Sequence, residues 1–207
     1  MGNEELTSII QTCVMEGYVC ALHAIGDRAI DQALDAMTGV YSDAENLRIE
    51  HCEVAGDGQV ERLARSPALL VMQPNFVRNW GMSGGIYERR LGAARFRHCN
   101  RWRTLRNAGI PFVFSSDCMP PGPLHGLAGA TEHPFQEERL DPADAIDRYT
   151  RLPNQVGLHR REAGTLEPGK LADLVVLDGN PLDGDFDRIR VRQTFVGGQL
   201  VYDATSE

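Results

Sequence analysis

The sequence predicts an α/β fold, with a parallel sheet covered by helices and then a short antiparallel β segment. Two observations predict the sheet: short apolar runs alternate with helical stripes, and the runs are too continuous for strands with one solvated face. The third observation is a change to turn-rich, strand-like text from Gly164 onward. The alternation fits either a barrel or an open doubly wound sheet.

The first elements are read from apolar spacing between residues 1 and 65. Apolar residues at helical spacing predict a helix over 6–14, which Gly17 ends, and the run 18–22 predicts a buried strand ending at His23. There follow a helix over 29–37 that Asp27 is expected to cap, a strand over 47–49 ending at His51, and a helix over 59–65.

The same alternation continues through the middle of the chain. The predicted elements are a strand over 68–73, a long glycine-rich connection, a helix over 101–107, a strand over 111–114 that leads to Asp117, and a helix over 143–150. In the connection, 81–85 holds three glycines and is expected to be the most mobile loop. Asp141 and Pro142 are expected to start the last helix, and Pro153 to interrupt it.

The C-terminal text predicts a small β unit. Residues 164–170 read as a turn, 171–177 as a strand, and 191–202 as a hairpin around Gly197 and Gly198. We therefore divide the chain into residues 1–163, the helix-covered sheet, and residues 164–207, the β segment.

Composition excludes several classes of protein. The 207 residues carry 21 Lys and Arg against 29 Asp and Glu, a formal charge of −8, which opposes binding to nucleic-acid phosphates. No apolar run approaches the roughly 20 residues that span a bilayer, and the acidic start lacks the positive region of a signal peptide. The five cysteines are odd in number and form no C-x-x-C pair, so we expect a reducing cytoplasm.

Polar side chains follow the predicted strands at their carboxyl ends, where parallel α/β folds gather their functional groups. These residues are His23, His51, Gln73 and Asp117. Two histidines and a carboxylate can converge on one divalent cation, and imidazole with carboxylate suits zinc. Taken singly, each histidine also fits a hydrogen-bonded structural role, and Asp117 fits a turn.

The text around these residues resembles a known family. The segments are 23–29 (HAIGDRA), 48–52 (RIEHC), 71–76 (VMQPNF), 114–117 (FSSD) and 164–178 (GTLEPGKLADLVVLD). In order and spacing they are similar to the third group of the amidohydrolase superfamily, which includes N-substituted formamide deformylases and proteins described as exoenzyme regulators.

The resemblance implies the C-terminal half of a metal-dependent hydrolase (β/α)8 TIM barrel, plus part of a small β-sandwich domain. In such enzymes strands five, six and eight end in His, His and Asp, here His23, His51 and Asp117. The histidines would bind a divalent metal, most simply zinc. Asp117 would bind the metal or take a proton from the attacking water and deliver it to the leaving nitrogen. The implied reaction is hydrolysis of an amide or formamide C–N bond of a small molecule.

One departure from the family pattern limits this expectation. The family also uses a His-x-His pair on its first strand and a Lys or Glu ligand on its fourth, and no His-x-His occurs in this sequence. The site is therefore expected to be incomplete, with weak metal binding and no activity of this chain alone. The alternatives are a non-catalytic remnant, a regulatory or binding protein, or one subunit of a split enzyme.

Other residues near the strand ends have two interpretations. Gln73, Phe76 and Trp80 could form a substrate wall or could be ordinary packing. Cys52 and Cys118 adjoin the proposed ligands and are expected to be buried behind the sheet, because neighbours on a strand point to opposite faces. The remaining histidines are expected in solvated surface roles, in loops or near helix ends, and His125 is the one that could instead face the pocket; they are His98, His125, His133 and His159.

Half a barrel leaves two sheet edges open. Residues 18–22 would lack a preceding neighbour and 111–114 a following one, exposing backbone groups and side chains such as Val113. We therefore expect a homo-oligomer or a complementing N-terminal half as partner.

Overall fold

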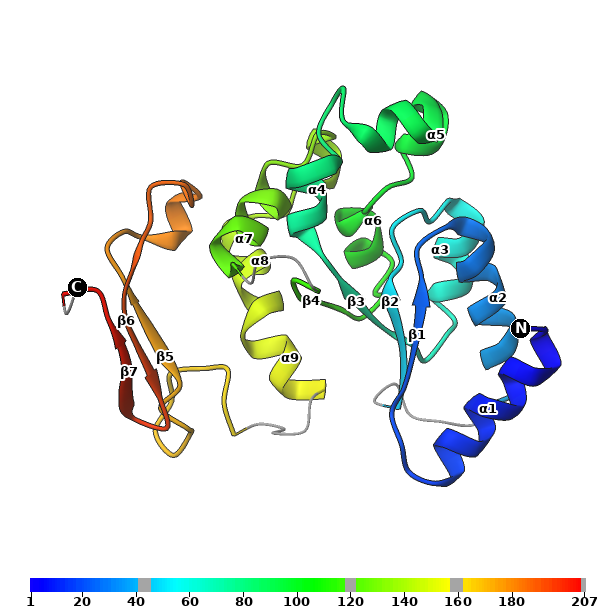
Figure 1. Cartoon of the computed structure of the whole chain (residues 1–207), viewed down its shortest axis with the longest axis horizontal. Helices are drawn as coiled ribbons and strands as arrows, with labels where there is room; N and C mark the ends of the chain where they lie inside the picture. Colours follow the sequence, from blue (N-terminus) through cyan, green and yellow to red (C-terminus); the bar gives the residue numbers. More distant parts are fainter. Residues whose placement is uncertain (41–45, 118–121, 157–161, 206–207) are drawn as a thin grey trace.

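The computed structural model describes residues 1–40, 46–117, 122–156 and 162–205. These residues form a four-stranded parallel sheet flanked by helices and a separate three-stranded antiparallel sheet at the C-terminal end (Figure 1). In the sequence, all four strands of the parallel sheet come before residue 163 and all three strands of the antiparallel sheet come after residue 164. The α/β class with a parallel sheet is therefore as the sequence predicts.

The parallel sheet is built in chain order from four short strands. They are β1 (Cys20–Ala24), β2 (Leu47–His51), β3 (Leu69–Met72) and β4 (Phe112–Phe114), and each pairs in parallel with the next. Five helices predicted from apolar spacing are present: α1 (Asn3–Met15), α2 (Asp27–Met37), α3 (Asp57–Leu63), α6 (Trp102–Asn107) and α8 (Pro142–Tyr149). Among the described residues, β1 and β4 are the sheet edges, each with a single neighbouring strand.

Three helices between residues 74 and 131 were not predicted, and glycines interrupt the apolar pattern of two of them. The glycine-rich connection contains α4 (Pro74–Trp80) and α5 (Ile86–Phe96), and α7 (Pro123–Thr131) follows β4. Residues 81–85 form the tight link between α4 and α5, in which Gly85 donates to the Met82 carbonyl at 2.7 Å. None of the helices in the described ranges has the length and hydropathy needed to cross a bilayer.

Helix ends agree with the sequence in one case and differ in two. Asp141 caps α8 as predicted, accepting a hydrogen bond from the Asp144 amide at 2.9 Å. Asp27 is not the cap of α2: Gly26 holds that position, and Asp27, inside the first turn, pairs with Arg95 at 2.8 Å. Pro153 does not end α8, which stops at Thr150. It lies in the first turn of α9 (Arg151–Val156), where a helix requires no N–H donor.

The two faces of the parallel sheet differ sharply in exposure. Side chains such as Leu47, Ile49 and Leu70 are 0% exposed and pack against the helices. On the other face His23 is exposed and Arg48 and Glu50 are half-buried, so β2 alternates apolar and polar residues. The open face is therefore largely polar, and Val113, expected to meet water, is only 7% exposed.

The C-terminal strands form the predicted hairpin. β5 (Leu174–Leu177), β6 (Val191–Val196) and β7 (Gln199–Asp203) pair antiparallel in that order. Gly197 and Gly198, between β6 and β7, have φ of 56° and 79°, the left-handed values that a two-residue turn of this type requires.

The segment between β5 and β6 returns to the main core. After the short helix η2 (Pro181–Asp183), Phe186 is 2% exposed and Ile189 is 4% exposed, and both belong to the same buried cluster as the sheet. Arg78 of α4 donates to Asp187 at 2.6 Å beside them. The C-terminal segment is thus attached to the sheet by buried side chains as well as by the chain itself.

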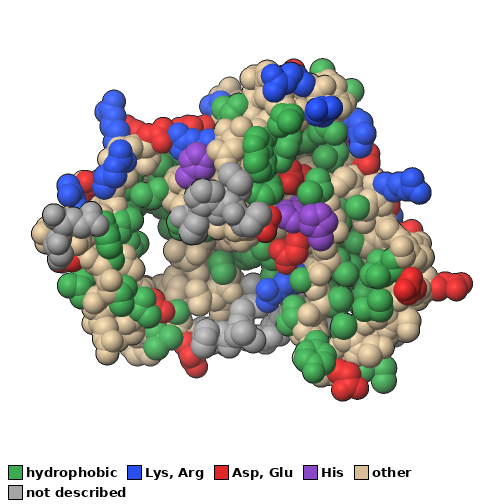
Figure 2. Space-filling view, viewed as in Figure 1, with side chains coloured by type: hydrophobic (Ala, Val, Ile, Leu, Met, Phe, Trp, Pro, Cys, Tyr) green, Lys and Arg blue, Asp and Glu red, His purple; other side chains and the backbone are tan. Residues whose placement is uncertain are grey.

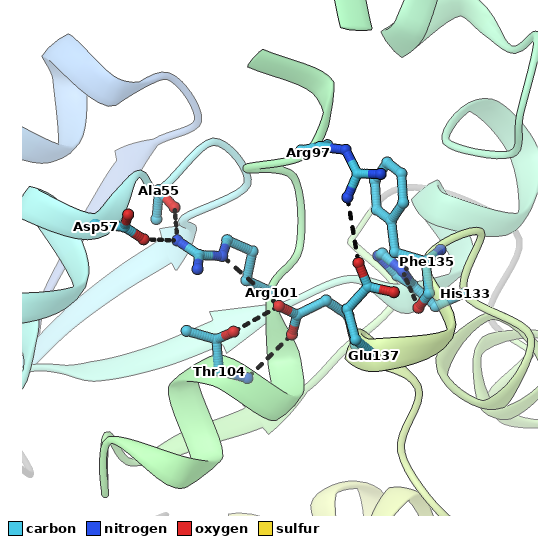
Figure 3. Close-up of polar contacts among 9 residues, drawn as sticks. Ala55, Asp57, Arg97, Arg101, Thr104, His133, Phe135 and Glu137 are labelled. Atoms are coloured by element: carbon cyan, nitrogen blue, oxygen red, sulfur yellow. Dashed lines mark hydrogen bonds and ion pairs between the residues drawn. The ribbon is translucent and has the colours of Figure 1, made fainter. Parts of the chain in front are cut away.

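A polar network joins the start of α3, helix α6 and the segment after α7 (Figure 3). Arg101 donates to Asp57 at 2.7 Å and lies 3.6 Å from Glu138 in the short helix η1 (Gln136–Glu138). The Thr104 amide donates to the same Glu138 carboxylate at 3.0 Å. Since Glu138 is only 5% exposed, these donors compensate for the burial of its charge.

Candidate functional site

A cavity of about 630 Å³ opens on the polar face of the parallel sheet, at the strand ends. Side chains from all four strands or the residues directly after them line it. They include His23, Glu50, His51, Gln73, Ser115 and Asp117. Figure 2 shows histidine, acidic and basic side chains together in the hollow at the centre of this face. The structure thus brings His23, His51 and Asp117 to one cavity.

The two histidines are in direct contact. His23 of β1 and His51 of β2 have ring centroids 4.5 Å apart in an edge-to-face arrangement. They meet because β1 and β2 are in register with His23 opposite Glu50 and Ala24 opposite His51.

Gln73 determines which nitrogen of His51 carries the proton. The Gln73 amide nitrogen donates to the Val71 carbonyl at 3.0 Å and to the Ser115 hydroxyl at 2.9 Å. A backbone carbonyl can only accept, so the Gln73 oxygen is the atom 2.8 Å from His51 Nδ1. Nδ1 therefore carries the proton and donates it to Gln73. This leaves Nε2 of neutral His51 with a free lone pair.

The environment of His51 keeps it neutral. Burial lowers its pKa most, and the neighbouring His23 lowers it further, while Gln73 and Asp117 act in the opposite direction. The ring also stacks on Phe76 of α4, with centroids 6.0 Å apart and planes 15° apart. A neutral imidazole with one free nitrogen is the form that binds a metal or accepts a proton.

Left-handed backbone concentrates at the site. His51, Cys52 and Asp117 have φ of 74°, 49° and 53°, and Asn100 is the other described non-glycine residue with a positive value. Such conformations cost on the order of 1–3 kcal/mol each and persist where the surrounding structure imposes them. The turn at His51 also ends the strand alternation, so that Glu50 and His51 both line the cavity.

The loop that carries Asp117 is anchored to α4. The Ser115 amide donates to the Met72 carbonyl at 2.9 Å, and Asn75 donates through its side chain to the Ser116 carbonyl at 3.0 Å. Asn75 is 3% exposed. Asp117 itself is exposed to the cavity.

Sequence reasoning missed Arg48, Glu50 and Ser115 as site residues. Burial raises the pKa of Glu50, as does nearby Asp117 to a smaller degree, while Arg48 and His23 lower it. The alternation of polar and apolar residues in 47–51 was the available signal, since it places Arg48 and Glu50 on one face.

Among the residues that the structure describes, no group of three or more His, Cys, Asp or Glu side chains has the spacing to hold a metal ion. The donors at the cavity nevertheless suit a divalent cation in kind: two imidazoles and the carboxylates of Glu50 and Asp117. The cavity therefore offers part of a ligand set.

The three residues expected to form a substrate wall separate into two places. Gln73 is 2% exposed at the polar cavity, where its amide is engaged by His51 and Ser115. Phe76 and Trp80 line a neighbouring apolar cavity of about 430 Å³ and are in contact, with ring centroids 4.8 Å apart.

The other singled-out residues lie away from the cavity. His125 lies near the start of α7, as expected, and contacts Asn79 at 3.0 Å. His133 is only 1% exposed, contrary to the expected surface role. His98 is half-buried between α5 and α6. Cys52 is buried as expected, and burial raises its pKa to about 12. Cys118 and His159 fall outside the described residues.

Comparison with known sequences gives one consistent family. A model described as an amidohydrolase family matches residues 1–202. The chain is 31% identical over 208 residues to the N-substituted formamide deformylase of Arthrobacter pascens, and this alignment covers 91% of this chain and 37% of that protein. It is 29% identical over 220 residues to the amidohydrolase YtcJ of Bacillus subtilis strain 168, and this alignment covers 97% of this chain and 40% of that protein. The chain thus spans about two fifths of the length of these relatives.

Solved structures agree with the sequence comparison. A metal-dependent hydrolase of Pyrococcus horikoshii OT3 is similar with a TM-score of 0.77 and 30% identity, over 92% of this chain and 40% of that one. A metal-dependent hydrolase of Pyrococcus furiosus has a TM-score of 0.75 and 30% identity, over 88% of this chain and 38% of that one. Ochratoxinase of Aspergillus niger shares the fold, with a TM-score of 0.68 and 22% identity. The match covers 98% of this chain and 46% of that one.

Proposed function

The chain belongs to the amidohydrolase family, and from this premise we propose that it forms the His23, His51 and Asp117 side of an active site that hydrolyses amide or formamide C–N bonds. One observation carries the proposal. Gln73 holds His51 with Nε2 unprotonated, and His51 lines one cavity together with His23 and Asp117. An imidazole fixed in this way is prepared to act as a ligand rather than as a structural hydrogen-bond donor.

The residues present fit a divalent metal as a partial ligand set. His23 and His51 would be its nitrogen ligands, and Asp117 a carboxylate ligand or proton carrier. When bound, zinc or a similar ion polarises a carbonyl and lowers the pKa of water. Since no described group of three converges, we propose that further ligands come from strands that complete the barrel, in a longer or a separate polypeptide.

In the completed site each residue has one task. His51 stays neutral because it is buried, and Gln73 keeps its ring in orientation. The Asp117 carboxylate, on a loop that Asn75 anchors, would take a proton from the attacking water and return it to the leaving nitrogen. The odd number of cysteines, with Cys52 buried and its pKa raised, fits a reducing compartment such as the cytoplasm.

A non-catalytic role is the second candidate, as a binding or regulatory protein that retains this part of the fold. It is favoured by the absence of a three-residue metal group in the part of the chain that the structure describes.

Metal binding and hydrolysis by the purified chain test the proposal. We expect Co²⁺ added to the chain to give a weak absorption spectrum typical of nitrogen and oxygen ligands, which His51→Ala and Asp117→Asn abolish. His125→Ala is the matched control, because His125 is exposed in α7 and its hydrogen bond is to Asn79. Identical spectra in all three variants would show that the ligands lie elsewhere.

The two candidate functions differ in what completion restores. We expect no formamide hydrolysis by the chain alone, and metal-dependent hydrolysis after co-expression with the N-terminal part of a full-length relative. A complex that binds metal through His51 yet hydrolyses no amide would favour the non-catalytic role.

A further inference from the structure

The apolar cavity of about 430 Å³ lies beside the candidate site. Its walls come from the connections after β1 and β2 and from helices α4 and α5. Most of the lining residues are apolar, namely Ile25, Val54, Phe76, Trp80, Ile86 and Leu91, and the others are Tyr87, Glu53 and Arg90. Figure 2 shows hydrophobic side chains gathered next to the polar hollow on this face.

Phe76 connects the two cavities. One side of its ring stacks on His51 at 6.0 Å, and it also contacts Trp80 at 4.8 Å inside the apolar cavity. A group bound in the apolar cavity would therefore lie one aromatic ring away from the imidazole.

Large apolar side chains remain exposed at this place. Ile25, Trp80 and Ile86 are 38%, 36% and 41% exposed, although they gather around one hollow. Apolar surface concentrated in this way marks a binding site more often than it marks ordinary surface.

We propose that this cavity is the subsite for a neutral aromatic substituent of the amide substrate, an inference that rests on the proposed function for its role in hydrolysis. A cavity of about 150 Å³ is enough to hold benzene, so 430 Å³ accepts a substituted ring. The tilted rings of Phe76 and Trp80 offer a face and an edge, which aromatic groups prefer as partners. A charged substituent would lose hydration against the walls, which are mainly apolar although Glu53 and Arg90 form part of them.

Tryptophan fluorescence tests the proposal in metal-free buffer. The chain has two tryptophans, of which Trp80 lines the cavity and Trp102 is 0% exposed. We expect N-benzylacetamide to change the emission saturably, and N-methylacetamide, which has the amide without the ring, to have no effect. Phenylacetate should bind more weakly than N-benzylacetamide. The emission change should disappear in Trp80→Phe.

A matched pair of variants locates the binding. Ile86→Asp places a charge in the cavity wall and should weaken N-benzylacetamide binding at least tenfold. Ile9→Asp is the same exchange on α1 at nearly equal exposure, 42% against 41%, and should leave binding unchanged. Circular dichroism of both variants shows whether they are folded. Leu91→Ala is a second cavity variant, which enlarges the cavity without adding charge and is expected to weaken binding.

Equal responses to both amides, tighter binding of phenylacetate, or equal affinities in Ile86→Asp and Ile9→Asp would overturn the subsite. Because the measurement needs neither metal nor turnover, a failure of the proposed hydrolysis leaves it intact. Conversely, a completed enzyme that hydrolyses aliphatic and aromatic amides equally well would overturn the subsite and retain the function.

Discussion

Replacing Gln73 by leucine should release the orientation of His51. Leucine has a similar size but no hydrogen-bonding atoms, so the Nδ1 proton of His51 and the Val71 carbonyl lose their partner at 2.8 and 3.0 Å. The Ser115 hydroxyl, which accepts from the Gln73 amide, is only half-buried and can accept a hydrogen bond from water instead. The imidazole is then free to move its proton to Nε2, the nitrogen that wild-type Gln73 leaves unprotonated.

The cost follows from burial. Gln73 is 2% exposed and His51 is 6% exposed, so water cannot replace the lost partner without local opening. Each buried donor or acceptor left without a partner costs about 1–3 kcal/mol, which for two groups is about 2–6 kcal/mol of unfolding free energy. Loss of a group that orients a metal ligand typically lowers metal affinity by about 10- to 100-fold.

Nitrogen-15 chemical shifts of the imidazoles measure the proton position directly. We expect wild-type His51 to carry its proton on Nδ1, and Gln73→Leu to shift it partly or wholly to Nε2, with a lower urea midpoint and weaker Co²⁺ binding. Asn79→Leu is the matched control, since it removes an amide that contacts His125 at 3.0 Å where both residues are exposed. It should change neither stability nor metal binding.

The reasoning is refuted if His51 keeps the Nδ1 proton in Gln73→Leu. A loss of stability with an unchanged proton position would leave Gln73 as a packing residue only.

Three further predictions follow from the edges of the sheet, the ligand set and a buried histidine. Light scattering at micromolar concentration should show a dimer or larger species, because β1 and β4 each have one open edge in the described sheet; a well-folded monomer contradicts this. Metal analysis after dialysis should find clearly less than one zinc per chain, and stoichiometric zinc unaffected by His51→Ala would mean that the ligands are elsewhere. Burial lowers the pKa of His133 to about 4, against about 6.5 in the unfolded chain. Because the unfolded state takes up the proton first, the stability that neutral His133 contributes is complete above pH 6.5 and is lost as the pH falls toward 4. Free energies of unfolding from urea titrations at pH 7.5 and pH 5 should differ by about 2 kcal/mol because of this residue. His133→Asn, which keeps an acceptor for the Phe135 amide, should remove that part of the difference.

The strands were predictable because buried apolar runs bounded by glycine and proline have few alternatives. The missed helices show where this reasoning stops. In α7, a Cβ atom at Gly129 would lie 2.2 Å from the Pro74 carbonyl, and one at Gly126 would lie 1.9 Å from the Tyr149 hydroxyl. These glycines allow α7 to pack closely on α4 and α8. A residue that is unfavourable for a helix in isolation is thus required by tertiary contact.

The candidate site divides in the same way. The strand ends alone located His23, His51 and Asp117 around one cavity. The contact of Gln73 with His51 spans 22 positions in the sequence, and the left-handed turn that brings Glu50 and His51 to the same cavity depends on φ at one residue. Neither leaves a periodic signal, so only the folded arrangement reveals them.

Phe186 and Ile189 bear on where the chain can be divided. A protein cut after residue 163 would retain the whole parallel sheet but would lose two side chains from its interior. Removing one large buried aromatic residue costs about 3–5 kcal/mol, a large part of the 5–15 kcal/mol that stabilises an ordinary domain. The antiparallel sheet is therefore not a detachable appendage. The two sheets should melt in a single transition, and a shortened protein meant to isolate the cavity needs to keep the segment that carries Phe186 and Ile189 together with the strands on either side of it.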